Sequence, residues 1–185
     1  MSFSLAGIRI EIHFAFFAVL LLLTQLTGND WAIWCAFCCL IHELGHVLAY
    51  SICGTRPREI HLEAGGMRII PPQTMLSNRQ EAFVLLGGVL ANFLAAGILI
   101  SLQVWQAAGV HLFLAAFNLI PLRALDGGQL LALAFRKIFL PNTAEKMTAG
   151  IHWIFLGILL TAGIFLLFRT GNFTLLLTVI CLGFL

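Results

Sequence analysis

Long apolar segments recur along this chain and are separated by short polar breaks. The second of them, residues 31–53, contains one charged residue in more than twenty positions. Stretches of about 20 apolar residues are what a helix needs to cross a bilayer. The pattern therefore predicts about six transmembrane helices. Their approximate ranges are 14–26, 31–53, 82–105, 107–139 with an interruption, 148–168 and 173–185.

Two segments outside these helices have the alternation of a strand. Residues 3–13 alternate between apolar and polar side chains, with a slip at Ala6-Gly7, and are predicted to form a strand. Residues 58–70 are predicted to form a hairpin that turns at Gly65-Gly66. The expected fold is an all-α polytopic membrane protein with a small membrane-associated β-sheet, built as one domain over residues 1–185.

Composition supports a membrane protein and excludes some partners. The chain is 61% hydrophobic and 10% charged, whereas charged residues make up about 25% of a soluble domain. A net charge of +2 is too small to indicate nucleic-acid binding, so the expected partner is the lipid bilayer.

The distribution of basic residues predicts the orientation in the membrane, because cytoplasmic loops carry an excess of Lys and Arg. Eight basic residues fall in segments assigned to one side, and Arg169 falls on the other. Both termini and the hairpin are therefore expected in the cytoplasm. The eight are Arg9, Arg56, Arg58, Arg68, Arg79, Arg136, Lys137 and Lys146.

The motif that most specifically indicates metal binding and catalysis is H-E-L-G-H, which lies inside the second apolar segment. His42 and His46 are four residues apart, so on a helix they share a face and can bind one metal ion. Glu43 follows the first histidine and can act as general base toward a water on that metal. A charge at membrane depth costs about 2.5–3.5 kcal/mol on insertion scales, which makes an intramembrane Glu a functional candidate.

A catalytic zinc site needs a third protein ligand, and Asp126 is the candidate. His46 lies ten residues before Arg56, and Asp126 lies ten before Arg136, which puts both about 15 Å from the cytoplasmic face. The break at 121–128 fits, since irregular backbone at membrane depth is tolerated where it is buried in protein or lines a watery cavity. An ion pair between Asp126 and Arg123 is the alternative.

Other polar residues in the apolar segments have two interpretations each. Asn92 and Asn118 either hold a substrate carbonyl or its oxyanion, or hydrogen-bond between helices. Cys38 and Cys39 lie one turn before His42, and we expect them to be small apolar residues rather than metal ligands. The other histidines are scattered and are expected at interfaces or helix ends.

These motifs, in this order, resemble the site-2 protease family of intramembrane zinc metalloproteases. Besides H-E-L-G-H, residues 87–92 are similar to the family's G-P-x-x-N, although they contain no proline. Residues 117–128 are similar to its N-x-x-P…L-D-G. In the family a proline commonly precedes Leu-Asp-Gly, whereas this chain has Arg123-Ala124 there. The resemblance covers about residues 5–140 as the catalytic core, followed by two further helices. The layout looks most like the branch that processes sporulation transcription-factor precursors.

The resemblance implies a zinc metalloendopeptidase with one Zn²⁺ per chain. His42, His46 and Asp126 would bind the zinc, Glu43 would be the catalytic base, and Asn92 and Asn118 would position the substrate. The substrate would be a transmembrane or membrane-associated protein, such as a transcription-factor or anti-sigma-factor precursor, and regulatory membrane proteins are possible partners. The substrate must unwind, and a free edge of the hairpin could capture it as an added strand. The residues expected to dock it are Ile60, His61, Leu62, Gly65 and Gly66, with residues 67–70 as the other edge.

Three functions other than proteolysis use some of the same residues or none of them. A membrane di-iron oxygenase would need a second Glu-x-x-His, and only Glu43 to His46 supplies one. A haem-binding or metal-transport protein could use several of the histidines. A non-enzymatic scaffold would give Glu43 no role.

Overall fold

The computed structural model describes residues 2–183 except 6, 28–30 and 64–65, and divides the chain into two compact units. The first comprises residues 1–116 and the second residues 117–185. The first unit contains the sheet and the helices that carry H-E-L-G-H and Asn92. The second contains the helix that begins at Asp126.

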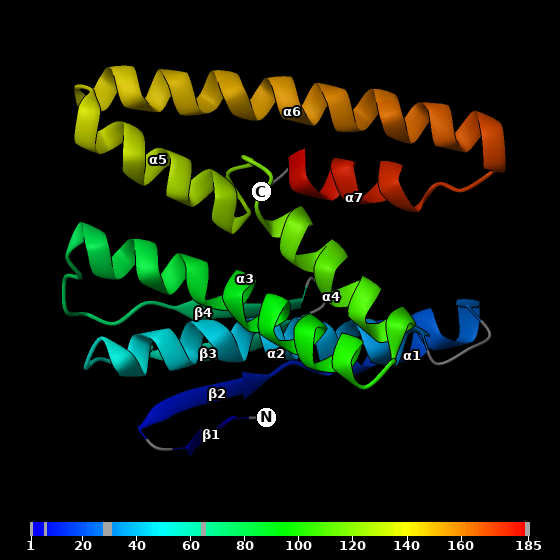
Figure 1. Ribbon diagram of the computed structural model, residues 1–185, viewed down its shortest axis with the longest axis horizontal. Coiled ribbons are helices and arrows are strands. Elements are labelled where there is room, and N and C mark those ends of the chain that lie inside the picture. Colours follow the sequence, from blue (N-terminus) through cyan, green and yellow to red (C-terminus); the bar gives the residue numbers. More distant parts are fainter. Residues whose placement is uncertain (1, 6, 28–30, 64–65, 184–185) are drawn as a thin grey trace. The chain divides into compact units, whose positions relative to one another are not determined.

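A four-stranded sheet in the order β1-β2-β3-β4 belongs to the first unit (Figure 1). Its strands are β1 (Ser2–Leu5), β2 (Ile8–Ile12), β3 (Glu59–Glu63) and β4 (Gly66–Ile70). The single strand expected over residues 3–13 is wrong. The slip is a turn at Gly7, where φ is +82°, and it folds β1 antiparallel onto β2. The hairpin at 58–70 is confirmed, while Gly65 lies outside the described residues.

The strands at the centre of the sheet are parallel, with Glu11 opposite His61. This places the hairpin beside the N-terminal segment, a pairing between residues fifty positions apart that local alternation cannot indicate. Since side chains alternate across a strand, one face of the sheet is polar and the other apolar. Ile69, on the apolar face, packs against Ala49, Tyr50 and Val84 of the helices.

The described residues of the first unit form four helices, of which α2 (Trp31–Ile52) and α3 (Asn78–Ser101) pack side by side (Figure 1). The others are α1 (Phe14–Thr27) and α4 (Trp105–Asn118), whose end enters the second unit. Helix α3 begins four residues before the expected start, because Ser77 and Gln80 form a capping box. It ends before Gln103, which has a φ of +60°.

Glycines let α2 and α3 approach closely. A Cβ added at Gly87 would lie 2.7 Å from the carbonyl oxygen of Gly45 and 2.8 Å from the Cβ of Ala49. Small residues at such crossings are typical of helices packed within a bilayer. The glycine inside H-E-L-G-H therefore brings the two histidines up against α3.

The second unit consists of α5 (Asp126–Ile138), α6 (Pro141–Thr170) and α7 (Thr174–Gly183), together with the break that precedes them. Helices α5 and α7 both pack against α6 (Figure 1). The expected interruption is confirmed: α4 ends at Asn118 and α5 begins at Asp126. Leu122 and Leu125 of the break are buried with Leu182, and Leu156 and Leu159 of α6 pack against them.

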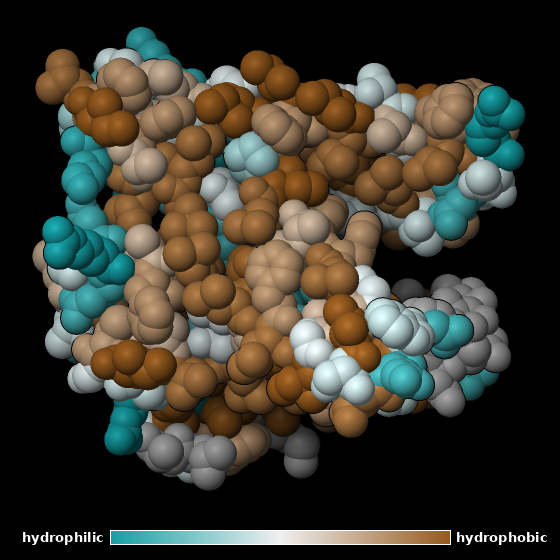
Figure 2. All heavy atoms as spheres, viewed as in Figure 1, coloured by the Kyte–Doolittle hydropathy of each residue, from teal (hydrophilic) through white to brown (hydrophobic). Residues whose placement is uncertain are grey.

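Three of the described helices are long and apolar enough to cross a membrane, namely residues 33–52 of α2, α3 and α6. The six spans expected from the sequence are not confirmed, because α1, α4, α5 and α7 have only 10 to 14 residues. Large apolar side chains are nevertheless exposed, and hydrophobic residues cover most of the face in Figure 2. A soluble protein rarely exposes so large an apolar area, so the chain is a membrane protein.

Candidate metal centre

His42 and His46 lie on one face of α2 and bring two imidazole nitrogens together. Their Nε2 atoms are 3.2 Å apart, and the two rings are nearly perpendicular. Both residues are buried, at 4% and 7% exposure. The pairing predicted from the four-residue spacing is therefore present.

The outward-facing nitrogens of both rings have partners on α3. His46 Nδ1 lies 2.7 Å from the carbonyl oxygen of Val84, so Nδ1–H donates and Nε2 keeps its lone pair. His42 Nδ1 lies 3.1 Å from the side-chain amide of Asn92. Partners of this kind fix the orientation of metal-binding histidines.

The donor set fits zinc. Two nitrogens bound to one tetrahedral zinc at roughly 2.0–2.1 Å lie about 3.3–3.4 Å apart. The observed separation of 3.2 Å between the two Nε2 atoms is close to that value. Neutral imidazoles buried in an apolar helix are also ligands that zinc accepts readily.

Gly88 leaves the space beside these two nitrogens open. A Cβ added at Gly88 would lie 2.5 Å from His46 Nε2 and 2.6 Å from both His42 Nε2 and His42 Cε1. The rings cannot move aside freely, because Val84 and Asn92 hold them. The glycine is therefore required by the histidine pair.

This close approach gives a testable prediction. Gly88→Ala should lower zinc affinity by about 10- to 100-fold, the range seen when ligands lose their orientation. Competition with a chromogenic zinc chelator measures the effect. Gly97→Ala on the same helix is the matched control, since nothing lies within 4 Å of its added Cβ. Equal affinities in the two variants would contradict this account of Gly88.

Glu43 lies on α2 directly after His42 and is half-buried. A step of one residue turns an α-helix by about 100°, so Glu43 starts from a different face of α2 than the histidines. A long side chain on that neighbouring face can serve a water at the histidine pair.

Asn92 joins the histidine pair to a residue that the sequence did not single out. It is fully buried, and its Oδ1 lies 2.8 Å from Nδ1 of His111, which is itself 2% exposed. His111 Nε2 lies 3.4 Å from Sγ of Cys38, so this buried thiol contacts His111. Cys39 is exposed on α2. A lone histidine in an apolar helix carries no sequence signal of its partners.

Asp126 and Asn118 belong to the second unit. Asp126 is the first residue of α5, and Asn118 is the last residue of α4. Gly127 and Gly128 lie against the carbonyl oxygens of Leu119 and Leu122, where an added Cβ would clash. The L-D-G-G sequence thus lets the start of α5 fold tightly onto the break that precedes it.

The sheet residues expected to capture substrate are only partly suited to it. Ile60, His61 and Leu62 are paired with β2 on one side and β4 on the other, so the edge expected there is wrong. Gly66 begins β4, which is an outer strand of the sheet, and Gly65 lies outside the described residues.

The polar face of the sheet holds a second group of metal-ligand types, Glu11, His13 and His61. Its one carboxylate already has a cationic neighbour, since Arg9 lies 3.8 Å from Glu11. His61 donates to Glu59 at 2.9 Å, and this hydrogen bond, reinforced by nearby arginines, lowers the pKa of Glu59. A network of charged side chains accounts for this group.

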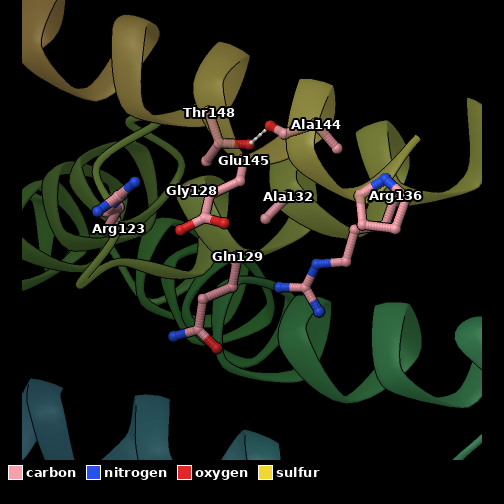
Figure 3. Close-up of a pocket in the computed structure, with 9 residues that line it drawn as sticks. Arg123, Gly128, Gln129, Ala132, Arg136, Ala144, Glu145 and Thr148 are labelled. Atoms are coloured by element: carbon pink, nitrogen blue, oxygen red, sulfur yellow. Dashed lines mark hydrogen bonds between the residues drawn. The ribbon is translucent and has the colours of Figure 1, made fainter. Parts of the chain in front are cut away.

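A cavity of about 440 Å³ lies within the second unit, between α5 and α6 (Figure 3). Gln129 and Arg136 line it from α5, and Glu145 and Thr148 line it from α6. Glu145 is the one carboxylate among its described lining residues, and no histidine or cysteine joins it. The cavity is therefore not the candidate metal centre.

Comparisons with known proteins agree with the motifs. Residues 101–161, which include Asn118 and Asp126, match the model of peptidase family M50, a family of zinc metalloproteases. No curated protein matches the chain. Among solved structures, the site-2 protease from Methanocaldococcus jannaschii has a similar fold, with a TM-score of 0.73 at 24% identity. That similarity covers 100% of this chain and 92% of the other. The family match over residues 101–161 and the shared fold agree with the resemblance that the motifs indicated, and the chain has the fold of a site-2 protease.

Proposed function

We propose that this protein is an intramembrane zinc metalloprotease that hydrolyses peptide bonds of transmembrane or membrane-associated proteins. The observation that carries the proposal is the buried pair of His42 and His46, with Nε2 atoms 3.2 Å apart on an apolar helix long enough to cross a membrane. Glu43 sits beside this pair. A buried, fixed imidazole pair next to a carboxylate supports metal-assisted hydrolysis better than a structural role.

Asp126 is proposed as the third protein ligand. A catalytic zinc site has three protein ligands and a water. The two histidines supply two of these ligands, so a third is needed. The M50 match includes Asp126, and the tight start of α5 holds its backbone in place. One Zn²⁺ per chain follows from this single set of ligands.

Bound zinc would supply Lewis acidity and lower the pKa of an attacking water toward 7. The residues of the chain perform the proton transfers. Glu43 takes a proton from the water while the water oxygen bonds to the scissile carbonyl carbon. Glu43 then delivers a proton to the leaving amine as the C–N bond breaks. Asn118 is proposed to donate a hydrogen bond to the substrate carbonyl. The same role remains a prediction for Asn92, whose amide lies against His42 and His111.

The substrate is proposed to bind as an extra strand on β4. A peptide bond in a helix is shielded by hydrogen bonds, so an extended segment is easier to cleave, and strand addition holds it extended. β4 is an outer strand, and its neighbour β3 occupies one side only. The docking assigned to the hairpin from the sequence therefore moves from β3 to β4.

Strand addition predicts a backbone effect at Met67, which lies opposite Leu62 and whose N–H faces away from β3. Met67→Pro should raise KM for an extended substrate by about 10-fold or more, because proline removes the N–H that would pair with the substrate. Met67→Ala is the control, as it shortens the side chain but keeps the backbone N–H. Peptide cleavage kinetics in detergent separate KM from kcat. If the two variants had the same KM, strand addition at β4 would be ruled out.

The proposed orientation places both termini, the sheet and most basic residues in the cytoplasm, with several passes through the membrane. Candidate substrates are precursors of transcription factors or anti-sigma factors, including sporulation factors, and regulatory membrane proteins are candidate partners. Cleavage near the cytoplasmic face would release such a factor into the cell. Protease protection in sealed vesicles measures the orientation.

Metal removal tests the proposed function directly. Purified full-length protein should contain one zinc per chain and cleave a single-span substrate in proteoliposomes. Treatment with a strong chelator should abolish cleavage, and stoichiometric zinc should restore it, because the attacking water depends on the metal. A protein that binds zinc but cleaves no candidate precursor at any concentration would favour a metal-transport or storage protein. Haem absorbance or two irons per chain would exclude the zinc protease.

A further inference from the structure

A row of hydrogen-bonding groups leads from the histidine pair to Cys38, entirely within the first unit. The row is formed by Cys38, His111, Asn92 and His42, and we call it the histidine–asparagine relay. All four residues are at most 4% exposed. Groups buried this deeply must satisfy their hydrogen bonds within the protein.

As the atoms are placed, every bond in the row can run in the same direction. The thiol of Cys38 donates to His111 Nε2 at 3.4 Å, and His111 Nδ1–H donates to Asn92 Oδ1 at 2.8 Å. Asn92 Nδ2–H donates to His42 Nδ1 at 3.1 Å. His42 Nε2–H then donates to His46 Nε2 at 3.2 Å.

A metal on His42 Nε2 is incompatible with this direction. A metal takes the lone pair of Nε2, so the proton of the neutral ring must sit on Nδ1. Nδ1–H is a donor and needs an acceptor, which the Asn92 amide provides only if its oxygen turns toward His42. The amide nitrogen then donates to His111 Nδ1, and the His111 proton must sit on Nε2, facing the sulfur of Cys38.

We infer that Asn92 and His111 are positioning residues that set the tautomer of His42, and that metal binding reverses the direction of the histidine–asparagine relay. The inference rests on the proposed zinc site at His42 and His46. Both directions contain the same number of protons: one proton moves from Nε2 to Nδ1 on His42, and one from Nδ1 to Nε2 on His111. The amide turns by half a rotation, and both rings stay neutral.

The relay has a consequence for metal affinity. Zinc must shift the relay from one direction to the other, so any change that favours the reversed direction should tighten zinc binding. His46 needs no such change, because Val84 O already fixes its proton on Nδ1. His42 is therefore the ligand through which residues distant from the metal can tune its affinity.

The decisive experiment observes His111 in the unaltered protein. The full chain, labelled with ¹⁵N-histidine and held in detergent, is studied by long-range ¹H–¹⁵N spectra that report which ring nitrogen carries the proton. We expect His111 to be protonated on Nδ1 after chelation and on Nε2 with one equivalent of zinc. An unchanged His111 tautomer in a protein that binds zinc and cleaves substrate would overturn the relay and leave the proposed protease intact.

Zinc affinities of variants test the same relay independently. Asn92→Leu should weaken zinc binding by about 10- to 100-fold, since His42 loses its orienting partner. His111→Phe should weaken it less, by several-fold. Gln106→Leu on the same helix as His111 is an exposed control and should have no effect. If His111 served packing alone, His111→Phe would lower thermal stability and leave zinc affinity unchanged.

A third variant distinguishes positioning from general damage. Asn92→Asp places an acceptor at both positions of the side chain, so His42 Nδ1–H finds an oxygen without any turn of the group. Zinc affinity should be retained or raised. In that background His111→Phe should no longer weaken zinc binding. Loss of affinity in the double variant equal to that of His111→Phe alone would contradict the relay.

Discussion

Glu43→Gln is expected to abolish peptide cleavage while leaving one zinc per chain. The amide keeps the size of the side chain but cannot take a proton from water. Removal of a general base typically lowers the rate by about 10²- to 10⁴-fold. The loss should appear in kcat, because Glu43 is not among the residues proposed to bind zinc or the substrate strand.

The measurement is cleavage of a single-span precursor by mass spectrometry, alongside zinc analysis of the same preparation. Glu81→Gln on α3 is the control, since it makes the same chemical change outside the proposed site. Full activity in Glu43→Gln would refute the assigned base. Loss of zinc together with activity would instead mean that Glu43 binds the metal.

Asp126→Asn is expected to lower zinc affinity by more than about 100-fold. Loss of residues that merely orient metal ligands costs 10- to 100-fold, and loss of a charged ligand should cost more. The asparagine preserves shape, so the start of α5 and its contacts with the preceding break should remain. Peptide cleavage should fall in parallel and recover in part at high zinc concentration.

Chelator competition measures the affinity, and Glu145→Gln in the same unit is the control for loss of one carboxylate. Unaltered affinity in Asp126→Asn would remove Asp126 from the site. That result would favour the alternative raised by the sequence, an ion pair between Asp126 and Arg123.

The histidine pair was predictable because it depends only on the spacing of two residues within one helix. A four-residue spacing within one apolar helix places His42 and His46 on the same face, whatever the rest of the chain does. The break before Asp126 was also predictable, since proline and two glycines interrupt an apolar segment there. Helix ends were less accurate, as α3 shows, because a capping box at Ser77 extended it into polar sequence.

Features that depend on distant pairing were not predictable. In the sequence, the turn at Gly7 was visible only as an interruption of the alternation within one expected strand. The parallel pairing of β2 with β3 occupies the edge of the hairpin that was expected to be free. His111 gave no signal, since its partners Asn92 and Cys38 come from two other helices. Short apolar segments were read as full spans because hydrophobicity alone does not fix where a helix ends.

The zinc K-edge absorption spectrum of the full-length protein tests the central claim most directly. Two imidazole nitrogens and oxygen ligands at about 2.0–2.2 Å are predicted, from one zinc per chain. The His42→Ala and His46→Ala variants should lose that metal. A sulfur shell near 2.3 Å, or an unchanged spectrum in either variant, would show that zinc binds elsewhere and would contradict the account.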